Sequence, residues 1–250
     1  YTFDLKFVKE ALNIVKDINR KIITVVGGPH SSALPQQTME YFGKNLDFAF
    51  RGECERSFPA LINLLKGDRN IDFSGIPGLI WRENAGIRVN ACIFEEDLDS
   101  FGVPSWDLIH PENYPESQHG AFFKKFPIAP IMPTRGCPYQ CTFCAGKLVS
   151  GEKLRKRSIS GVIDEIRMLY ADFGIREFHI VDDNFTLDKA YAKEFSRQLI
   201  DQGLDISWAV PNGIRLDSLD EELLILMRQS GLYLVSVGVE SGSERILKSM

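Results

Sequence analysis

Short apolar segments alternate with stretches of helical spacing through the second half of the chain. The apolar segments span residues 128–133, 177–181, 206–210 and 234–239. Helical patterns cover residues 159–170, 187–202 and 220–230, with Ser158 as the predicted cap of the first helix. Strand–helix repeats of roughly 25–30 residues are typical of parallel strands joined by right-handed crossovers. The second half is therefore predicted to form four strands of a parallel β/α barrel wall.

Polar side chains follow each of these predicted strands. The carboxyl ends of parallel strands meet at one edge, which carries the ligand sites of such folds. We therefore expect the side chains to share one functional mouth. They are Cys137, Cys141 and Cys144 after the first strand, Asp182 and Asp183 after the second, Asn212 and Arg215 after the third, and Glu240 after the fourth.

Cys137, Cys141 and Cys144 form a C-x3-C-x2-C run. Three thiolates this close in sequence can wrap one metal centre. A cubane of four irons and four sulfides usually takes four cysteines, so three leave one iron open to a substrate-like ligand. The run therefore indicates a catalytic iron–sulfur site.

Two other readings of the run stay open, a structural zinc site and chance proximity. Zinc would need a fourth ligand, usually from a second Cys or His pair. The histidines His30, His110, His119 and His179 form no such pair. A disulfide is excluded by the short spacing and the odd number. Cys54 and Cys92 are isolated in the sequence, and a lone cysteine is most often a small buried hydrophobic residue.

The bulk properties narrow the class of protein. The chain has 250 residues, 44% of them hydrophobic and 25% charged, with a net charge of −5. That balance is ordinary for a soluble protein and argues against nucleic-acid binding. We see no apolar stretch long enough for a membrane span, and the clustered thiols favour a reducing cytoplasm. Because the sequence starts at Tyr1 and stops inside a predicted helix, we expect a fragment.

The first half also alternates strands and helices. Predicted strands at 22–26 and 47–50 are separated and flanked by helices at 7–20, 35–42 and 57–65, which predicts a parallel α/β sheet. Ligands bind at the carboxyl ends of such strands, where Gly27, Gly28 and Gly52 lie. His30 is interpreted as a turn residue bonded to backbone.

The segment between the two halves has a different pattern. Residues 77–89 predict a hairpin with its turn at 84–86. Acids, prolines and scattered aromatics over 94–126 predict a linker that wraps rather than packs. We expect domains at 1–92 and 127–250, joined by a linker at 93–126.

The cysteine run, with Phe143 directly before the third cysteine, resembles the cluster-binding signature of radical S-adenosylmethionine (SAM) enzymes. The resemblance implies that SAM chelates the open iron and is cleaved reductively to a 5′-deoxyadenosyl radical. It also implies that Phe143 lies against the adenine. The enzyme would act on a small-molecule substrate and receive its electron from a donor of the flavodoxin or ferredoxin type.

The groups that SAM presents suggest roles for the other strand-end residues. Asp182 or Asp183 would accept from the ammonium, Arg215 would pair with the carboxylate as a bidentate fork, and Glu240 would accept from the ribose. The family comparison agrees in outline. The segment 182–185 stands where relatives carry an amino-group-binding motif, and 238–242 resembles the segment that contacts ribose and methionine. By contrast, Asp164 and Glu165 are assigned to a solvated helix face.

The first half resembles the cobalamin-binding domain that precedes the radical SAM domain in one large subfamily. The matching segments are 25–30, 51–55, the hairpin and the linker at 97–99. Two features depart from that pattern: Cys54 stands where glycine is expected, and the Asp-x-His-x-x-Gly loop is not in this sequence. The resemblance implies that Gly27 and Gly28 line the corrin or its tail. It also implies a partial Rossmann-like domain followed by four of the six strands of a radical SAM barrel.

Together these residues predict a radical SAM enzyme with a 4Fe–4S cluster, SAM and cobalamin as cofactors. The expected reaction is methyl transfer to a carbon or phosphorus radical, and oxidative cyclisation or rearrangement is also compatible with the resemblance. Two rival predictions are a radical SAM oxidoreductase or cyclase without cobalamin, and a non-catalytic zinc-binding interaction module.

Overall fold

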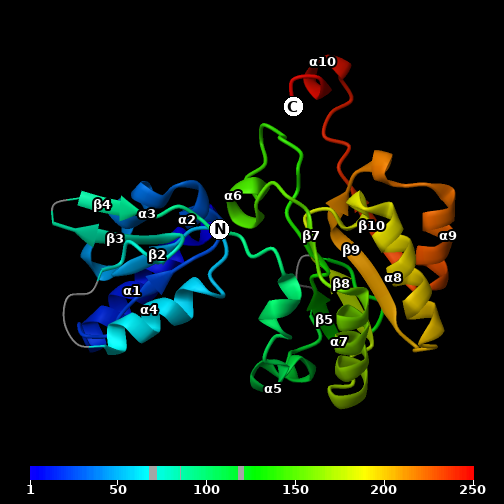
Figure 1. Cartoon of the computed structure of the whole chain (residues 1–250), viewed down its shortest axis with the longest axis horizontal. Helices are drawn as coiled ribbons and strands as arrows, with labels where there is room; N and C mark the ends of the chain where they lie inside the picture. The colour runs from blue at the N-terminus through cyan, green and yellow to red at the C-terminus, as the bar shows by residue number, and fades with distance from the viewer. Residues whose placement is uncertain (68–71, 85, 118–120) are drawn as a thin grey trace. The chain divides into compact units, whose positions relative to one another are not determined.

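Each of the two structural units of the chain is built on a four-stranded sheet (Figure 1). The computed structural model describes residues 1–67, 72–84, 86–117 and 121–250. Unit 1 comprises Tyr1–Glu95 with Pro138–Glu152, and unit 2 comprises Glu96–Cys137 with Lys153–Met250. These units differ from the predicted domains in two places, because 96–126 belongs to unit 2 and 138–152 to unit 1. His119, and Ala85 of the predicted turn, lie outside the described residues.

The sheet of unit 1 is mixed. Its order is β1 (Val25–Val26), β2 (Phe48–Phe50), β3 (Leu79–Glu83) and β4 (Gly86–Val89). The predicted parallel pairing is confirmed for β1 and β2, and the predicted hairpin continues the same sheet with antiparallel pairs. Strand β1 is shorter than expected, since Ile22 and Ile23 lie outside it and are 42% and 49% exposed.

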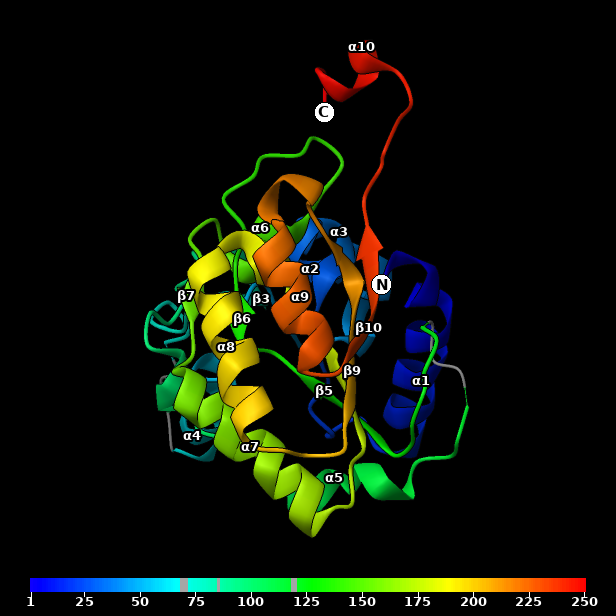
Figure 2. The same ribbon diagram turned by 90° about the vertical axis from the view of Figure 1, so that its right-hand side faces the viewer.

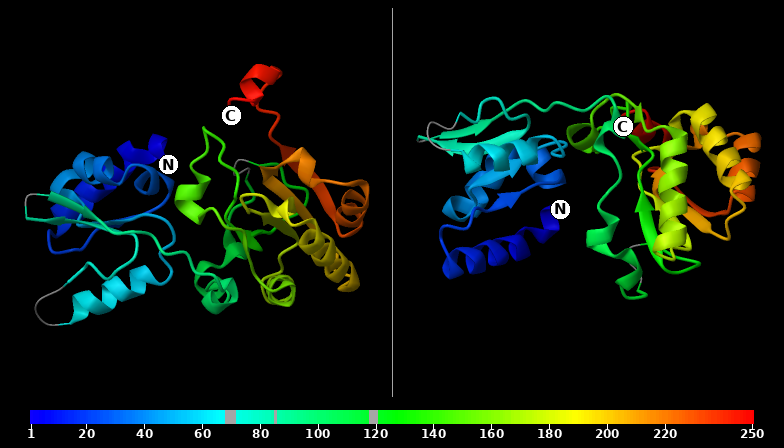
Figure 3. Two further views of the ribbon diagram at one scale, coloured as in Figure 1. Left: turned by 45° about the horizontal axis from the view of Figure 1, so that its top comes forward. Right: turned by 60° about the horizontal axis from the view of Figure 1, so that its bottom comes forward.

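Helices cover both faces of this sheet (Figure 3). They are α1 (Leu5–Ile18), α2 (Pro29–Ala33), α3 (Pro35–Phe42) and α4 (Ser57–Lys66), of which α2 was expected to be only a turn. Successive strand residues point to opposite faces. Ala49 and Ile80 therefore pack with α1 and α3, whereas Phe48, Phe50 and Trp81 pack with α4.

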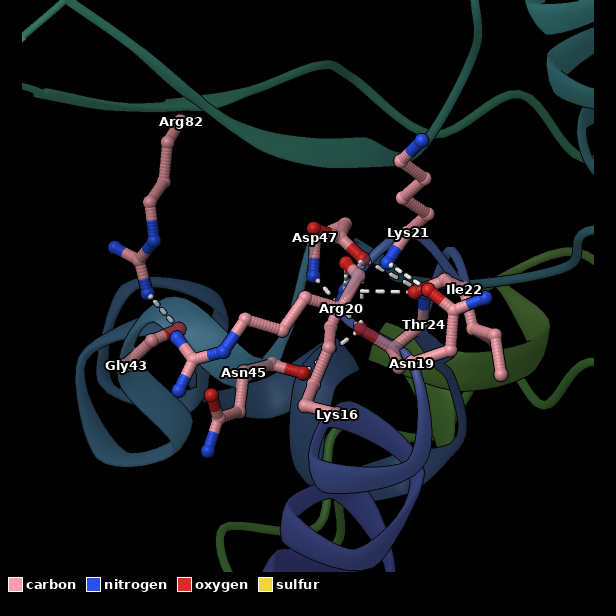
Figure 4. Close-up of polar contacts among 10 residues, drawn as sticks. All are labelled: Lys16, Asn19, Arg20, Lys21, Ile22, Thr24, Gly43, Asn45, Asp47 and Arg82. Carbon is pink, nitrogen blue, oxygen red and sulfur yellow. Dashed lines mark hydrogen bonds and ion pairs between the residues drawn. The ribbon is translucent and has the colours of Figure 1, made fainter.

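An ion pair between the buried Lys16 and the half-buried Asp47 ties α1 to the sheet of unit 1 (Figure 4). Asp47 accepts from Lys16 Nζ at 2.6 Å and from the backbone N–H and hydroxyl of Thr24 at 2.8 and 2.9 Å. Burial alone would raise the pKa of Asp47, but the hydrogen bonds from Lys16 and Thr24 hold it below its usual value. The carboxylate therefore fixes the helix end and the entry to β1 together.

The sheet of unit 2 is wholly parallel, as predicted. Its order is β10 (Leu232–Val237), β9 (Ser207–Ile214), β8 (Glu177–Ile180) and β5 (Ile128–Ile131). Three helices lie along one side of it, α7 (Ile159–Asp172), α8 (Lys189–Asp201) and α9 (Glu221–Gln229) (Figure 2). The Ser158 cap of α7 is confirmed by a hydrogen bond from Gly161 N to Ser158 Oγ at 3.2 Å.

Shorter elements complete the description of the fold. A small hairpin that was not predicted joins β6 (Thr134–Arg135) to β7 (Arg155–Lys156). The short helices are α5 (Trp106–Ile109), α6 (Gly146–Ser150) and α10 (Glu244–Leu247). Short 3-10 helices lie at Thr2–Asp4, Gly43–Asn45, Leu98–Phe101, Pro111–Asn113, Phe185–Leu187 and Leu216–Ser218. Among the described residues, we find no helix with the length and apolarity to span a membrane.

The prediction that residues 94–126 form a linker that does not pack into a hydrophobic core is wrong. Trp106 is 6% exposed and belongs to the hydrophobic core of unit 2. Its indole Nε1 donates to Glu165 Oε1 at 2.8 Å, and Arg157 Nη1 donates to Glu165 Oε2 at 2.5 Å. Glu165 is therefore a buried anchor for the segment, which corrects its assignment to a solvated helix face.

Candidate functional site

The stem of the cysteine loop is held by two consecutive carboxylates at the end of β8. Asp182 Oδ2 accepts from the backbone N–H of Thr134 at 2.9 Å and from its hydroxyl at 2.7 Å. Asp183 Oδ2 accepts from Gly136 N at 3.1 Å. The sequence predicts that the segments after β5 and β8 meet at one edge, and these hydrogen bonds connect the two segments directly within unit 2.

The two carboxylates have different environments. Asp182 is 1% exposed, and burial raises its pKa well above the usual range against the opposing effect of the Thr134 hydrogen bonds. Asp183 is exposed. Among the described residues, Asp182 Oδ1 and both amide atoms of the buried Asn184 have no hydrogen-bond partner. Buried polar atoms are usually paired, so this segment keeps unused capacity for a polar ligand.

The three cysteines of the run differ in accessibility. Cys137 and Cys141 are half-buried and Cys144 is exposed. Cys144 N donates to Cys141 O at 3.0 Å, and Gly146 N donates to Cys144 Sγ at 3.3 Å. Within the described ranges, no three His, Cys, Asp or Glu side chains stand close enough together to hold a metal ion. The donor set itself suits an iron–sulfur cluster, which takes thiolate ligands that accept N–H hydrogen bonds.

The residues of unit 2 that were predicted to contact SAM follow the ends of its parallel strands. Phe143 is 56% exposed in the cysteine loop. Arg215 follows β9 and already forms a bidentate pair with Asp217, at 3.0 Å from Nε and 2.7 Å from Nη2. Asn212 Nδ2 donates to Val181 O at 2.8 Å, which joins the ends of β8 and β9. Glu240 is exposed beyond β10 with a φ of 59°.

The glycine turn of unit 1 leaves open space above its backbone. Nothing lies within 4 Å of where a Cβ would stand on Gly27 or Gly28, and Gly28 has a φ of 101°, which favours glycine. Ser31 Oγ donates to Phe50 O at 2.6 Å, and Gly52 N donates to Ser32 Oγ at 2.9 Å. These bonds fasten α2, which follows the glycine turn, to the end of β2.

His30 is not a backbone-bonded turn residue, because it lies in α2 and its Nδ1 is 3.0 Å from the Thr2 hydroxyl. Cys54 is half-buried and packs beside the core on the α4 side of the sheet. Neither residue adds to the candidate site.

Sequence reasoning missed the buried network at Glu177 in unit 2. Its Oε2 accepts from the backbone N–H groups of Lys124 and Lys125 at 2.7 and 2.5 Å, and its Oε1 from His179 Nε2 at 2.9 Å. The Tyr233 hydroxyl lies 2.6 Å from Oε1 and 2.8 Å from Phe122 O, so its single proton serves one of them at a time. Burial alone would raise the pKa of Glu177, but these hydrogen bonds hold it below its usual value.

His179 also lines a cavity of about 550 Å³ in unit 2. The cavity lies on the face of the sheet opposite α7, α8 and α9, because its lining residues alternate with core residues along β5 and β8. Further lining residues include Ile128, Pro130, Val181, Asn212 and Phe126. The sequence signal for this cavity is His179, a histidine within a mostly apolar strand.

Fold and site together define a β/α protein with a thiol-bearing loop after the first strand of a parallel sheet. Residues 131–250 match the family model described as the Radical SAM superfamily. Residues 131–250 therefore belong to the radical SAM superfamily.

Curated relatives are similar over nearly the whole chain. An uncharacterized methyltransferase of Pyrococcus horikoshii is 34% identical over 94% of this chain and 49% of that protein. Cytidylyl-2-hydroxyethylphosphonate methyltransferase of Streptomyces wedmorensis is 32% identical over 97% and 49%. Anaerobic magnesium-protoporphyrin IX monomethyl ester cyclase of Rubrivivax gelatinosus is 29% identical over 94% and 42%. The chain spans about half the length of the curated relatives it matches.

A solved structure has the same fold. The radical SAM methyltransferase TsrM from Kitasatospora setae, with cobalamin and a 4Fe–4S cluster bound, superposes with a TM-score of 0.74 at 24% identity. The match covers 96% of this chain and 47% of that protein. The α/β fold with a parallel sheet is thus found in a known radical SAM enzyme.

Proposed function

We propose that this chain forms part of a radical SAM enzyme that cleaves SAM reductively at a 4Fe–4S cluster and transfers a methyl group in a cobalamin-dependent reaction to an unactivated carbon. The observation that carries the proposal is the cysteine loop. Its three cysteines follow the first strand of a parallel sheet, and its stem is fastened to the segment after the second strand. That is the place where β/α folds carry their chemistry.

Cys137, Cys141 and Cys144 would hold the cluster, which when bound supplies the electron for SAM cleavage. Of the two carboxylates after β8, Asp183 is the better acceptor for the SAM ammonium, because it is exposed while Asp182 is buried against Thr134. Phe143 would lie against the adenine and Glu240 would accept from the ribose. Arg215 would reach the SAM carboxylate only by exchanging its Asp217 partner for it.

Unit 1 would hold cobalamin at the open backbone of Gly27 and Gly28. The space beside these residues and the bonds that fasten α2 to the end of β2 support this assignment. The fold of unit 1 would then be the second part of a Rossmann-like domain, and unit 2 would supply four of six barrel strands. Two methyltransferase relatives support methyl transfer as the reaction.

A second candidate function is cyclisation by the same machinery. It is favoured by relatives named anaerobic magnesium-protoporphyrin IX monomethyl ester cyclase, three of which match this chain at 26–29% identity. Both reactions would need a small-molecule substrate and a flavodoxin- or ferredoxin-type electron donor in the cytoplasm. Incubation of the reduced protein with SAM and hydroxocobalamin separates them, since only the methyltransferase yields protein-bound methylcobalamin.

The test of the cluster is an anaerobic reconstitution of this chain with iron and sulfide. We expect about four irons and four sulfides per chain, and a paramagnetic signal after reduction that changes on adding SAM. Cys141→Ala is expected to lose the signal, whereas Cys92→Ala, a half-buried thiol outside the run, is the matched control. Zinc without acid-labile sulfide in the wild-type protein would refute the enzyme and favour the zinc module.

A further inference from the structure

The stem of the cysteine loop is supported from two sides within unit 2. On one side, β6 pairs with β7, with Thr134 opposite Lys156 and Arg135 opposite Arg155. On the other side, the carboxylates of Asp182 and Asp183 accept three hydrogen bonds from Thr134 and Gly136. The backbone is therefore fixed up to the residue before Cys137.

The chemistry of these contacts suits a rigid anchor. Asp182 uses one oxygen for both the N–H and the hydroxyl of Thr134, and it is 1% exposed, so the contact is closed to solvent. Gly136 has a φ of 87°, a conformation that other residues rarely adopt, and its N–H is the one that Asp183 accepts.

We infer that Thr134 with Asp182, and Gly136 with Asp183, are positioning pairs that set the place of the first cluster ligand, Cys137. The inference rests on the proposed function, because it concerns how the protein retains its cluster. A metal ligand on a preordered backbone loses less conformational freedom on binding. Replacing a residue that orients a ligand commonly lowers metal affinity by about tenfold or more. The pairs therefore control cluster retention without touching the cluster.

The experiment compares Thr134→Val with Thr134→Ser in the reconstituted chain. Valine has the shape of threonine but lacks the hydroxyl, and serine keeps it. Release of iron to an excess of EDTA is followed anaerobically without SAM, so that any role of Asp183 toward SAM is silent. We expect Thr134→Val to release iron about five times faster than wild type, with a changed g-value pattern of the reduced cluster, and Thr134→Ser to match wild type.

A second variant tests the other pair. Asp183→Ala is expected to accelerate iron release similarly, and Asp164→Ala, an exposed aspartate on α7, is the control. Equal release rates and equal spectra in Thr134→Val, Asp183→Ala and wild type would overturn the inference, even if the melting temperatures fell. A wild-type chain that takes up no cluster would instead refute the proposed function.

Discussion

Replacing Glu177 by Gln is expected to destabilise unit 2 strongly. Glu177 is fully buried, and four donors from three separate segments converge on its two oxygens. Glutamine keeps one carbonyl oxygen and places an amide NH2 where the other oxygen was. In its best fit the carbonyl oxygen stays at the N–H groups of Lys124 and Lys125, and the Tyr233 proton turns to Phe122 O. The amide NH2 is then left facing the His179 N–H donor.

The magnitude follows from those lost contacts. A hydrogen bond to a charged group contributes about 1.5–3 kcal/mol and one between neutral groups about 0.5–1.5 kcal/mol, so losing the bond from His179 and weakening the two from Lys124 and Lys125 costs roughly 3–5 kcal/mol. Because the hydrogen bonds lower the pKa of Glu177 in the folded state, this contribution is complete above the unfolded pKa of about 4.3. It is lost as the pH falls through the lower folded pKa, so the difference between wild type and variant shrinks in acid.

The assay is urea unfolding at pH 7 and at pH 3.5, monitored by tryptophan fluorescence. Trp106 and Trp208 belong to the core of unit 2, whereas Trp81 belongs to unit 1. A Trp81→Phe background therefore confines the signal to unit 2. Glu194→Gln on the surface of α8 is the control. A loss below about 1 kcal/mol at pH 7, or a difference that grows in acid, would contradict the reasoning.

Three further predictions concern the other anchors and SAM. Asp47→Asn leaves Lys16 buried beside a neutral amide, so unit 1 should lose about 2 kcal/mol at pH 7 and less below pH 4, measured by hydrogen exchange of unit 1 amides; equal losses at both pH values would disprove the pair's role. Trp106→Phe should cost unit 2 about 1–2 kcal/mol in urea unfolding, because Glu165 loses its indole donor; a segment that only wraps the surface would give no change. Glu240→Ala should weaken SAM binding about tenfold by calorimetry, as the loss of one charged hydrogen bond implies, with Glu244→Ala as the control; unchanged affinity removes the ribose assignment.

The elements that the sequence predicts well are those with a strong period and a cap. The α7 pattern, opened by Ser158, gives a helix that starts where predicted. The four strands of unit 2 pair in chain order because successive crossovers of one hand place each strand beside the last. In unit 1 the alternation of strands and helices predicts β1 and β2, and the predicted hairpin adds antiparallel strands next to β2.

The elements that the sequence does not predict depend on contacts between distant residues. Trp106 stands in a proline-rich stretch without period, and only the position of Glu165, 59 residues later, makes it a core residue. The β6–β7 hairpin has two residues in each strand, too few for an alternation to be recognised. The buried charge of Glu165 is predicted to lie on the surface, since a carboxylate is rarely buried without partners and its partner Trp106 is remote in sequence.

The same limit applies to the candidate site, where Asp182 and Asp183 are chemically identical in the sequence. Both follow β8, and the strand-end rule predicts only that one or both face the functional mouth. The structure separates them by burial: Asp182 is 1% exposed, whereas Asp183 is exposed. Asp182 then lies against Thr134 and Asp183 reaches solvent. The sequence can thus predict which residues lie at a strand end, but the pairing of β5 with β8 determines which carboxylate remains accessible to a ligand.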